Sequence, residues 1–204
     1  MSTFVDEFRG VDNLVFAEVK KDDNETDGGY VTGTVKPLAP VAEVSKSTDT
    51  SSATKYYDNA PALTINAEGS DEIKLTVAPL DLATLAEITG KQIDKATGAL
   101  MDGPASPKYF ALGYRFKLTD GTYRYVWRYK GSFAIPDESS ATEDDGTDSS
   151  NQELTYTGIT TRHKFTNTGT VQKAFVADER DGKCDISKFF DAVTTCDNAK
   201  AVGA

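Results

Sequence analysis

The sequence predicts a mainly β, antiparallel protein with one packed α-helix and a short C-terminal helix. Three observations support this fold class. Most apolar stretches alternate with polar residues at a period of two, as half-buried strands do. Clusters of Gly, Pro, Asn and Asp separate these stretches, and helical spacing occurs in only two short segments. At 204 residues, of which 38% are hydrophobic, the chain is long enough for a single domain, 1–204, with a sizeable core.

The first expected strand covers residues 12–20, whose alternation places apolar side chains on both faces. Such a strand is buried on both sides or contacts a neighbouring subunit. A polar tract, 20–29, follows and predicts a turn or loop. Pro37 and Pro40 then bracket a short extended segment, and 41–44 is expected to begin another strand.

A long loop is expected at 45–61, because its Ser-, Thr- and Asp-rich beginning cannot bury enough apolar surface to hold itself in place. Two adjacent tyrosines interrupt the polarity, and tyrosine is favoured at protein interfaces. Two interpretations are open: a contact arm for a partner, or a surface loop whose tyrosines fold back onto the body. The candidate contact residues are Thr48, Asp49, Thr50, Ser51, Lys55, Tyr56, Tyr57 and Asp58.

Residues 62–67 and 72–78 predict two strands that are joined by turn residues at 68–71. A helix is expected next. Asp81 can cap its N-terminus, apolar residues follow at helical spacing, and Gly90 suits the left-handed conformation that ends many helices.

The clearest local signal is a long antiparallel hairpin formed by 109–118 and 122–135, with Asp120-Gly121 as turn residues. Alternating aromatic and basic side chains could suggest an RNA-stacking sheet. A core face is the favoured interpretation, with the basic residues of the other face pairing with acidic groups elsewhere. The expected core residues are Phe110, Leu112, Tyr114 and Phe116 on the first strand and Tyr125, Trp127 and Tyr129 on the second.

The sequence after the hairpin predicts a hydrophilic acidic loop at 136–152 and two further strands at 153–165 and 170–176. Asp185 is expected to cap the short C-terminal helix. The apolar face of this helix would consist of Ile186, Phe189, Phe190 and Val193.

No residue pattern indicates catalysis, so we expect no enzyme, no cofactor and no metal. Nothing in the local sequence orients the single histidine, His163, as a catalytic base, and a surface or interface imidazole is the favoured interpretation. Cys184 and Cys196 lack the partners of a zinc site, and nothing indicates the oxidising compartment that a disulfide needs. Segment 141–152 fails the calcium-loop pattern at both end positions, although weak cation binding by its carboxylates stays open.

The formal net charge of −10 favours solubility and opposes DNA binding through phosphate neutralisation. A more specific interpretation is a surface past which nucleic acid slides without sticking. No apolar run is long enough to span a bilayer, and the N-terminus lacks the basic and apolar regions of a secretory signal. We therefore expect a protein that does not enter a membrane and is used inside a cell or released by lysis.

The chain resembles the major tail (tail tube) proteins of long-tailed, non-contractile bacteriophages of Gram-positive bacteria. The resemblance covers nearly the whole sequence. The matching stretches are GTVKPLAP (33–40), KYYDN (55–59), APLDLATLAEITG (78–90), YFALGYR (109–115), TYRYVWRYKG (122–131), FAIP (133–136) and ATEDDGTD (141–148).

The resemblance implies a β-sandwich or small barrel whose copies form hexameric rings. These rings would stack into the hollow tail tube, the conduit for genome delivery to the host cell. The loop at 45–61 would reach the adjacent ring. Expected partners are further copies of the chain and the tape-measure, tail-terminator and distal-tail proteins, with double-stranded DNA only passing through the lumen. The implied location is the virion tail, assembled in the host bacterial cytoplasm.

Two other function classes remain. The first is a β-sandwich receptor- or carbohydrate-binding decoration module of a virion, which would stay small and contact a ligand. The second is a hydrolase that uses carboxylates, and no sequence feature selects an acid–base pair for it.

Overall fold

The computed structural model describes residues 6–24, 29–137, 140 and 150–203. Its elements, in chain order, are β1 (Phe8–Asp22), β2 (Tyr30–Thr32), β3 (Lys36–Pro37), β4 (Val41–Tyr57), β5 (Ala60–Val77), α1 (Leu82–Thr89), β6 (Gln92–Ile93), β7 (Leu100–Met101), β8 (Phe110–Leu118), β9 (Tyr123–Phe133), β10 (Gln152–Gly158), β11 (Ala174–Asp178) and the 3-10 turn η1 (Glu179–Asp181).

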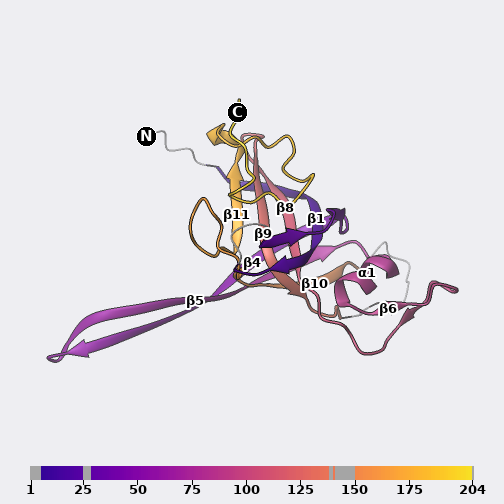
Figure 1. The fold of residues 1–204 in the computed structure, drawn as a ribbon, viewed down its shortest axis with the longest axis horizontal. Helices are drawn as coiled ribbons and strands as arrows, with labels where there is room; N and C mark the ends of the chain where they lie inside the picture. The colour runs from indigo at the N-terminus through magenta and orange to yellow at the C-terminus, as the bar shows by residue number, and fades with distance from the viewer. Residues whose placement is uncertain (1–5, 25–28, 138–139, 141–149, 204) are drawn as a thin grey trace, which may run out of the picture.

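The main sheet has the strand order β2-β1-β8-β9-β10-β5-β4, with β11 paired to β9 and β3 paired to β1. Every pairing is antiparallel. Figure 1 shows a body built around β1, β8 and β9, from which the outer part of the β4–β5 hairpin projects. The mainly β, antiparallel fold class is therefore confirmed, and it is consistent with a β-sandwich. No helix in the described part of the chain is long and apolar enough to cross a membrane.

The predicted β8–β9 hairpin is confirmed, with Gly121 at a φ of 91° in its turn. A bulge in β9 then divides its side chains between two faces. Phe110 lies opposite Gly131 whereas Leu112 lies opposite Arg128, so two steps on β8 match three on β9. An extra residue of this kind exchanges the faces of all side chains that follow it.

The expected core residues of this hairpin lie in two cores rather than on one core face. Leu112 and Tyr114 pack into the first core with β5, α1 and β10, and Phe133 joins them after the bulge. Trp127 and Tyr129 pack into the second core on the opposite side of the sheet. Phe110 belongs to the first core, Tyr125 belongs to the second, and Phe116 is only partly buried.

The second core is closed by the C-terminal segment of the chain. Phe189 and Val193 are buried in this core, and the centroid of the Phe190 ring lies 5.7 Å from that of the Trp127 ring. The indole N–H donates to the backbone oxygen of Phe189 at 2.9 Å. Gly113 leaves the space that the indole needs, because a Cβ there would lie 2.8 Å from Val15 and 2.9 Å from the Trp127 ring. Side chains of β1, β9 and the C-terminal segment are therefore buried together in the second core.

The expected basic residues of β9 pair with acidic side chains of this same chain. Arg124 lies 2.8 Å from Asp178 and Lys130 lies 2.6 Å from Asp22. The third basic residue, Arg128, contacts Asp71 at 3.3 Å. These pairs connect β9 to three distant segments of the sequence.

The predicted helix is confirmed as α1. The Asp81 side chain accepts a hydrogen bond from the Thr84 N–H at 2.8 Å, and Gly90 ends the helix at a φ of 69°. The same hydrogen bond is the main reason why the pKa of Asp81 lies below its usual value. This carboxylate therefore stays ionised beside the helix N-terminus.

The predicted C-terminal helix is absent from the described residues, which form turns at 187–193. The Asp185 carboxylate accepts from the Ser187 N–H at 3.0 Å, but the next bonds span three residues rather than four. The backbone oxygen of Phe189 also accepts from Trp127 and from the Thr194 hydroxyl. Side chains thus use an acceptor that a continuing helix would need.

Three other expected boundaries were wrong. The chain at 68–71 is not a turn between two strands, because β5 runs continuously from Ala60 to Val77. The expected loop at 45–61 consists mostly of the β4 and β5 strands. The expected strand at 153–165 ends at Gly158. Most of the acidic loop, including 141–149, lies outside the described residues.

Replacing Trp127 by alanine should lower the free energy of unfolding by about 3–5 kcal/mol, because it removes a fully buried indole and its hydrogen bond. Chemical denaturation of the variant and of the wild-type protein measures this difference. Ile135→Ala is the matched control, since this side chain is 60% exposed and should change stability by less than about 0.5 kcal/mol. An unchanged midpoint for Trp127→Ala would contradict the two-core arrangement.

Candidate functional site

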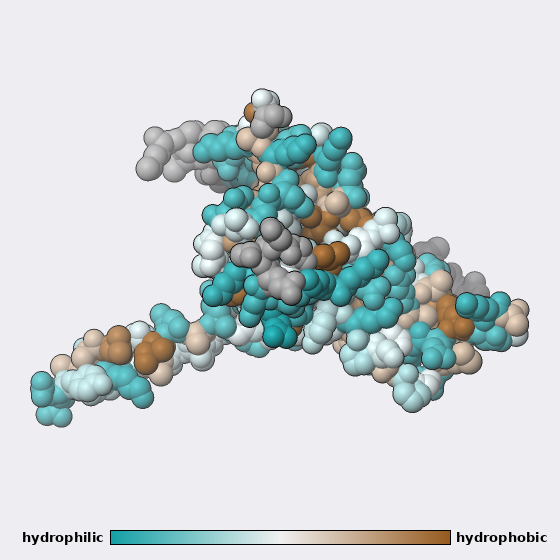
Figure 2. Space-filling model, viewed as in Figure 1, coloured by the Kyte–Doolittle hydropathy of each residue, from teal (hydrophilic) through white to brown (hydrophobic). Residues whose placement is uncertain are grey.

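The candidate functional site is the outer part of the β4–β5 hairpin, residues 49–69, which we call the arm. Every residue of the arm is exposed. Figure 1 shows it leaving the body as a two-stranded ribbon, and Figure 2 shows hydrophobic residues lying on it among hydrophilic ones. At about 3.4 Å per residue, the eight steps from Asp49 to Tyr57 extend it by roughly 27 Å.

The arm ends in a two-residue turn that fits its strands. Tyr57 pairs with Ala60, and the intervening Asp58 and Asn59 have φ values of 51° and 62°. Two consecutive positive φ values are typical of the type I′ turn, whose twist matches that of a β-hairpin. Asp and Asn tolerate this conformation better than most residues. The expected flexible loop is therefore an ordered strand pair.

The eight predicted contact residues are spread along the arm rather than gathered in one place. Thr48 lies at its root and is half-buried, and Asp49 accepts a hydrogen bond from the Ser70 hydroxyl at 3.1 Å. Thr50, Ser51 and Lys55 follow along β4. Tyr56, Tyr57 and Asp58 form the tip, where the two tyrosines are 67% and 64% exposed. The tyrosines do not fold back onto the body.

A second bulge lies at the root of the arm and decides which side chains face outward. Thr48 pairs with Asp71, whereas Thr50 pairs with Glu68, so two steps on β4 match three on β5. Asp71 shares the face of β5 that enters the first core in the body. Beyond the bulge, the odd-numbered residues of β5 change to the opposite face of the ribbon.

The two faces of the arm differ in chemistry. One face holds the cross-strand pairs Ala53–Ile65, Lys55–Leu63 and Ser51–Ala67, and we call it the apolar face. The other face holds the pairs Thr50–Glu68, Ser52–Asn66 and Thr54–Thr64, and we call it the polar face. Leu63 and Ile65 are 53% and 50% exposed, so the described residues leave the apolar face uncovered.

The candidate residues of β5 were missed by the sequence reasoning. The alternation at 62–67 indicated a strand, but its pairing with 50–55 was hidden because those residues were assigned to a loop. The repeated β-branched threonines at Thr48, Thr50 and Thr54 were the available signal.

Asp71 holds the root of the arm through a cluster of charges. This residue is 3% exposed and accepts a hydrogen bond from the Thr48 hydroxyl at 2.8 Å. Three cations surround its carboxylate: Arg128 at 3.3 Å, Lys46 at 3.5 Å and Lys173 at 3.6 Å. They come from β9, β4 and the segment before β11, so the cluster ties both strands of the arm to the body.

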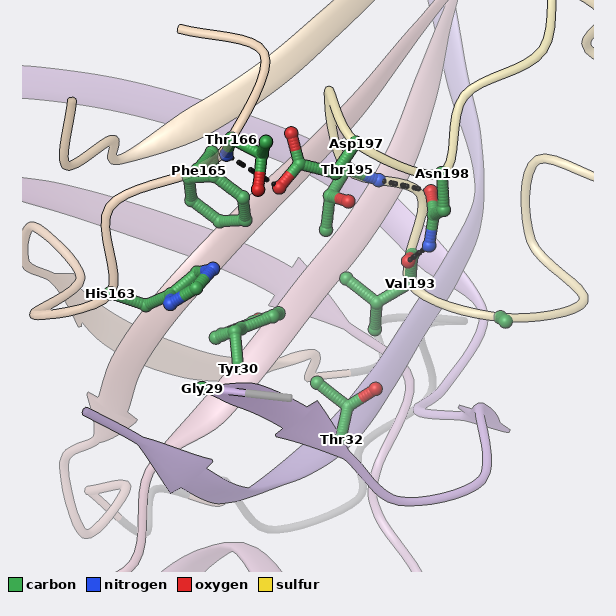
Figure 3. A pocket seen from close by; sticks show the side chains of 11 residues that line it. Gly29, Tyr30, Thr32, His163, Phe165, Thr166, Val193, Thr195, Asp197 and Asn198 are labelled. Carbon is green, nitrogen blue, oxygen red and sulfur yellow. Dashed lines mark hydrogen bonds between the residues drawn. The ribbon is translucent and has the colours of Figure 1, made fainter. Parts of the chain in front are cut away.

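The expectation of a surface or interface position for His163 was wrong, because this residue is 5% exposed. Its ring packs edge-on against Phe165 at a centroid distance of 5.0 Å. It lines a cavity of about 380 Å³. Figure 3 shows it beside this cavity, with Tyr30 nearby and Asn198 on the other side. The Nδ1 atom has no hydrogen-bond partner among the described residues. Thr161, His163 and Phe165 are buried whereas the intervening residues 162 and 164 are exposed, so His163 lies on the inward side of this segment.

Neither cysteine is arranged for nucleophilic chemistry. Burial raises the thiol pKa of both Cys184 and Cys196, which lowers the fraction present as reactive thiolate. Within the described ranges, no group of three or more His, Cys, Asp and Glu side chains could hold a metal ion.

Asp22 joins the end of β1 to β9 and to the chain at 162–163. Its carboxylate lies 2.6 Å from Lys130 Nζ and accepts backbone N–H bonds from Arg162 and His163. Burial alone would raise the pKa of Asp22, but these hydrogen bonds outweigh burial and lower the pKa below 3.8. A lowered folded-state pKa contributes stability above pH 4, and this contribution is lost as pH falls through the folded-state value.

Asp71→Asn should lower the free energy of unfolding by about 1–3 kcal/mol at pH 7, because three cations lose their shared buried carboxylate. The exposed neighbour Glu72→Gln is the control and should change it by less than about 0.5 kcal/mol. Hydrogen exchange should also speed up in the arm of Asp71→Asn. Equal exchange in both variants would show that Asp71 does not hold the arm.

Asp22→Asn should cost about 2 kcal/mol at pH 7, because it mimics the protonated carboxyl beside Lys130. The difference from wild type should shrink as pH falls below 4, where the wild-type carboxyl also becomes neutral. Denaturation midpoints measured from pH 7 to pH 2.5 test this. A difference that stays constant with pH would show that the charge of Asp22 does not contribute.

The exposed arm, with one apolar face and a charged root, is thus the feature of this chain with the geometry of a contact site. The sequence matches no protein-family model and no curated protein.

Proposed function

We propose that the chain is a structural virion protein, the tail tube subunit of a long-tailed phage, which assembles into stacked rings. The observation that supports the proposal most is the arm, whose residues 49–69 are all exposed although several of them are large and apolar. The sequence resemblance described above assigns an inter-ring contact to this segment. In this proposal no residue is catalytic and no cofactor is needed.

The energetics of the arm favour a role in assembly. An isolated two-stranded hairpin is marginally stable in water, because neither of its faces is buried. A subunit gains from covering such a ribbon with another protein, since each square ångström of apolar surface removed from water contributes about 25 cal/mol. The arm extends away from its own body, so the covering surface belongs to a neighbour (Figure 1).

The sheet also has edges that a ring can pair. β4 and β2 lie at the ends of the strand order, and each has a neighbour on one side only. Open edges promote uncontrolled pairing with other chains unless they are covered. A closed ring covers them by pairing the edge of one subunit with that of the next.

The charge of the chain suits a conduit for DNA. The formal net charge is −10, so acidic residues that face a lumen would repel the phosphate backbone and prevent it from sticking. The proposed partners are further copies of the chain, together with the tape-measure, tail-terminator and distal-tail proteins that the resemblance implies. DNA would be in the lumen only transiently and without specific contacts.

Negative-stain electron microscopy of the purified protein, from dilute to concentrated solution, tests the proposal. Rings or hollow tubes with six-fold end views are the expected result. Small particles at every concentration, also when a tail-initiating complex is added, would contradict it and favour the decoration module instead.

An armless variant, with residues 50–68 replaced by an Asn-Gly turn, should keep the melting temperature of the body but fail to form tubes. The reason is that the arm contributes no side chain to either core. Calorimetry and electron microscopy of the same sample measure both properties. Tubes of normal length from the armless variant would show that the arm is not an assembly element.

A further inference from the structure

The apolar face of the arm cannot be covered by the body from which the arm projects. The bulge at Gly69–Ser70 places Leu63 and Ile65 on the side of the ribbon opposite to the core face of β5. Between that bulge and the tip, the side that continues the core face holds the polar pairs Thr50–Glu68, Ser52–Asn66 and Thr54–Thr64. Its apolar pair, Tyr56–Pro61, lies at the tip, farthest from the body. Bending the arm toward its own core would therefore bring the polar pairs against the body and leave Leu63 and Ile65 exposed.

A matching surface lies at the other end of the same strand. We call it the Leu38 groove, an open apolar groove of about 810 Å³ beside the N-terminus of α1. Its floor and walls are formed by Leu14, Pro37, Leu38, Ala39, Pro40 and Val41. Asp81 and Thr84 of α1 form the opposite side, and all of its residues belong to the described part of the chain.

From these two surfaces we infer that the apolar face of the arm docks into the Leu38 groove of a second copy of this chain. The inference rests on the proposed function, since it names the receiving surface for the arm of a tube subunit. Val41 at the groove and Ala53 on the arm are twelve residues apart on one extended strand. At about 3.4 Å per residue, this separation is roughly 40 Å, so the two surfaces of one chain cannot meet.

The positions of the two surfaces set the geometry of the contact. The arm and α1 lie at opposite ends of the molecule (Figure 1). A contact between two different patches of identical chains is head-to-tail, and each added copy again presents a free arm and a free groove. Such a contact propagates, as the growth of a stacked assembly requires.

The charges of the two surfaces are complementary. Lys55 is the single charged residue of the apolar face, and it makes no ion pair with any described residue. The rim of the Leu38 groove carries the ionised, exposed carboxylate of Asp81. The cation that lines this groove, Lys36, is already paired with Glu87 at 2.7 Å, and the second carboxylate of the groove, Asp12, is paired with Arg115 at 2.5 Å. Leu63 and Ile65 would enter the groove while Lys55 contacts Asp81.

Cross-linking between two cysteine variants tests the docking directly. In a background of Cys184→Ser and Cys196→Ser, one preparation carries Leu63→Cys and the other carries Ala39→Cys. Mixing them under mild oxidation should give a covalent dimer that neither preparation forms alone. Thr64→Cys, on the polar face of the same strand, is the matched control and should cross-link to Ala39→Cys at least tenfold less.

A second pair of variants tests the energetics. Leu63→Ser combined with Ile65→Ser should raise the protein concentration needed for assembly at least tenfold, whereas Thr54→Ser combined with Thr64→Ser should leave it unchanged. Normal assembly by the Leu63/Ile65 variant, or equal cross-linking from both faces, would overturn the docking while leaving the proposed function intact. Cross-linked copies that never form rings or tubes would support the docking and contradict the proposed function.

Discussion

The buried carboxylate of Asp71 is the interaction on which the shape of the molecule depends. It lies where β5 leaves the core and becomes the arm, and it is contacted by cations from three separate segments. A buried charge is costly unless partners surround it, so this site is satisfied only when β9, β4 and the chain before β11 are all in place. The direction of the arm is therefore coupled to the completed fold of the body, although the arm itself adds nothing to either core.

Two bulges decide what the strands present to their surroundings. The bulge in β9 divides a continuous aromatic alternation between two cores, which is how one sheet supports packed layers on both sides. The bulge at Gly69–Ser70 moves the apolar alternation of β5 from the core side to the outside of the arm. Single inserted residues thus separate the side chains that pack the body together from those left exposed on the arm.

Much of this fold could be predicted from local patterns. The β8–β9 hairpin and α1 were predicted because turn chemistry and caps are set by neighbouring residues, as at Asp120-Gly121 and Asp81. In the arm, the strand at 62–67 was predicted, but its partner at 50–55 was assigned to a loop, because the order of that segment comes from cross-strand pairing rather than from burial. The two bulges could not be predicted from the sequence, because a register shift depends on which residues of the partner strand lie opposite. The prediction of a C-terminal helix was wrong, because Trp127, 62 residues away, donates a hydrogen bond to the backbone oxygen of Phe189 within that segment.

The ordered state of the arm changes the thermodynamics of association. A flexible segment of 49–69 would have to lose its backbone freedom at the moment of contact, at about 1–2 kcal/mol per residue. Here the type I′ turn, the strand ladder and the Asp71 cluster have already restricted that freedom in the free subunit. In the proposed assembly, contact with a partner would therefore resemble the docking of two rigid bodies. The conformational entropy lost on joining would then be small, so that weak apolar contacts along a narrow ribbon would suffice for reversible binding in the proposed assembly.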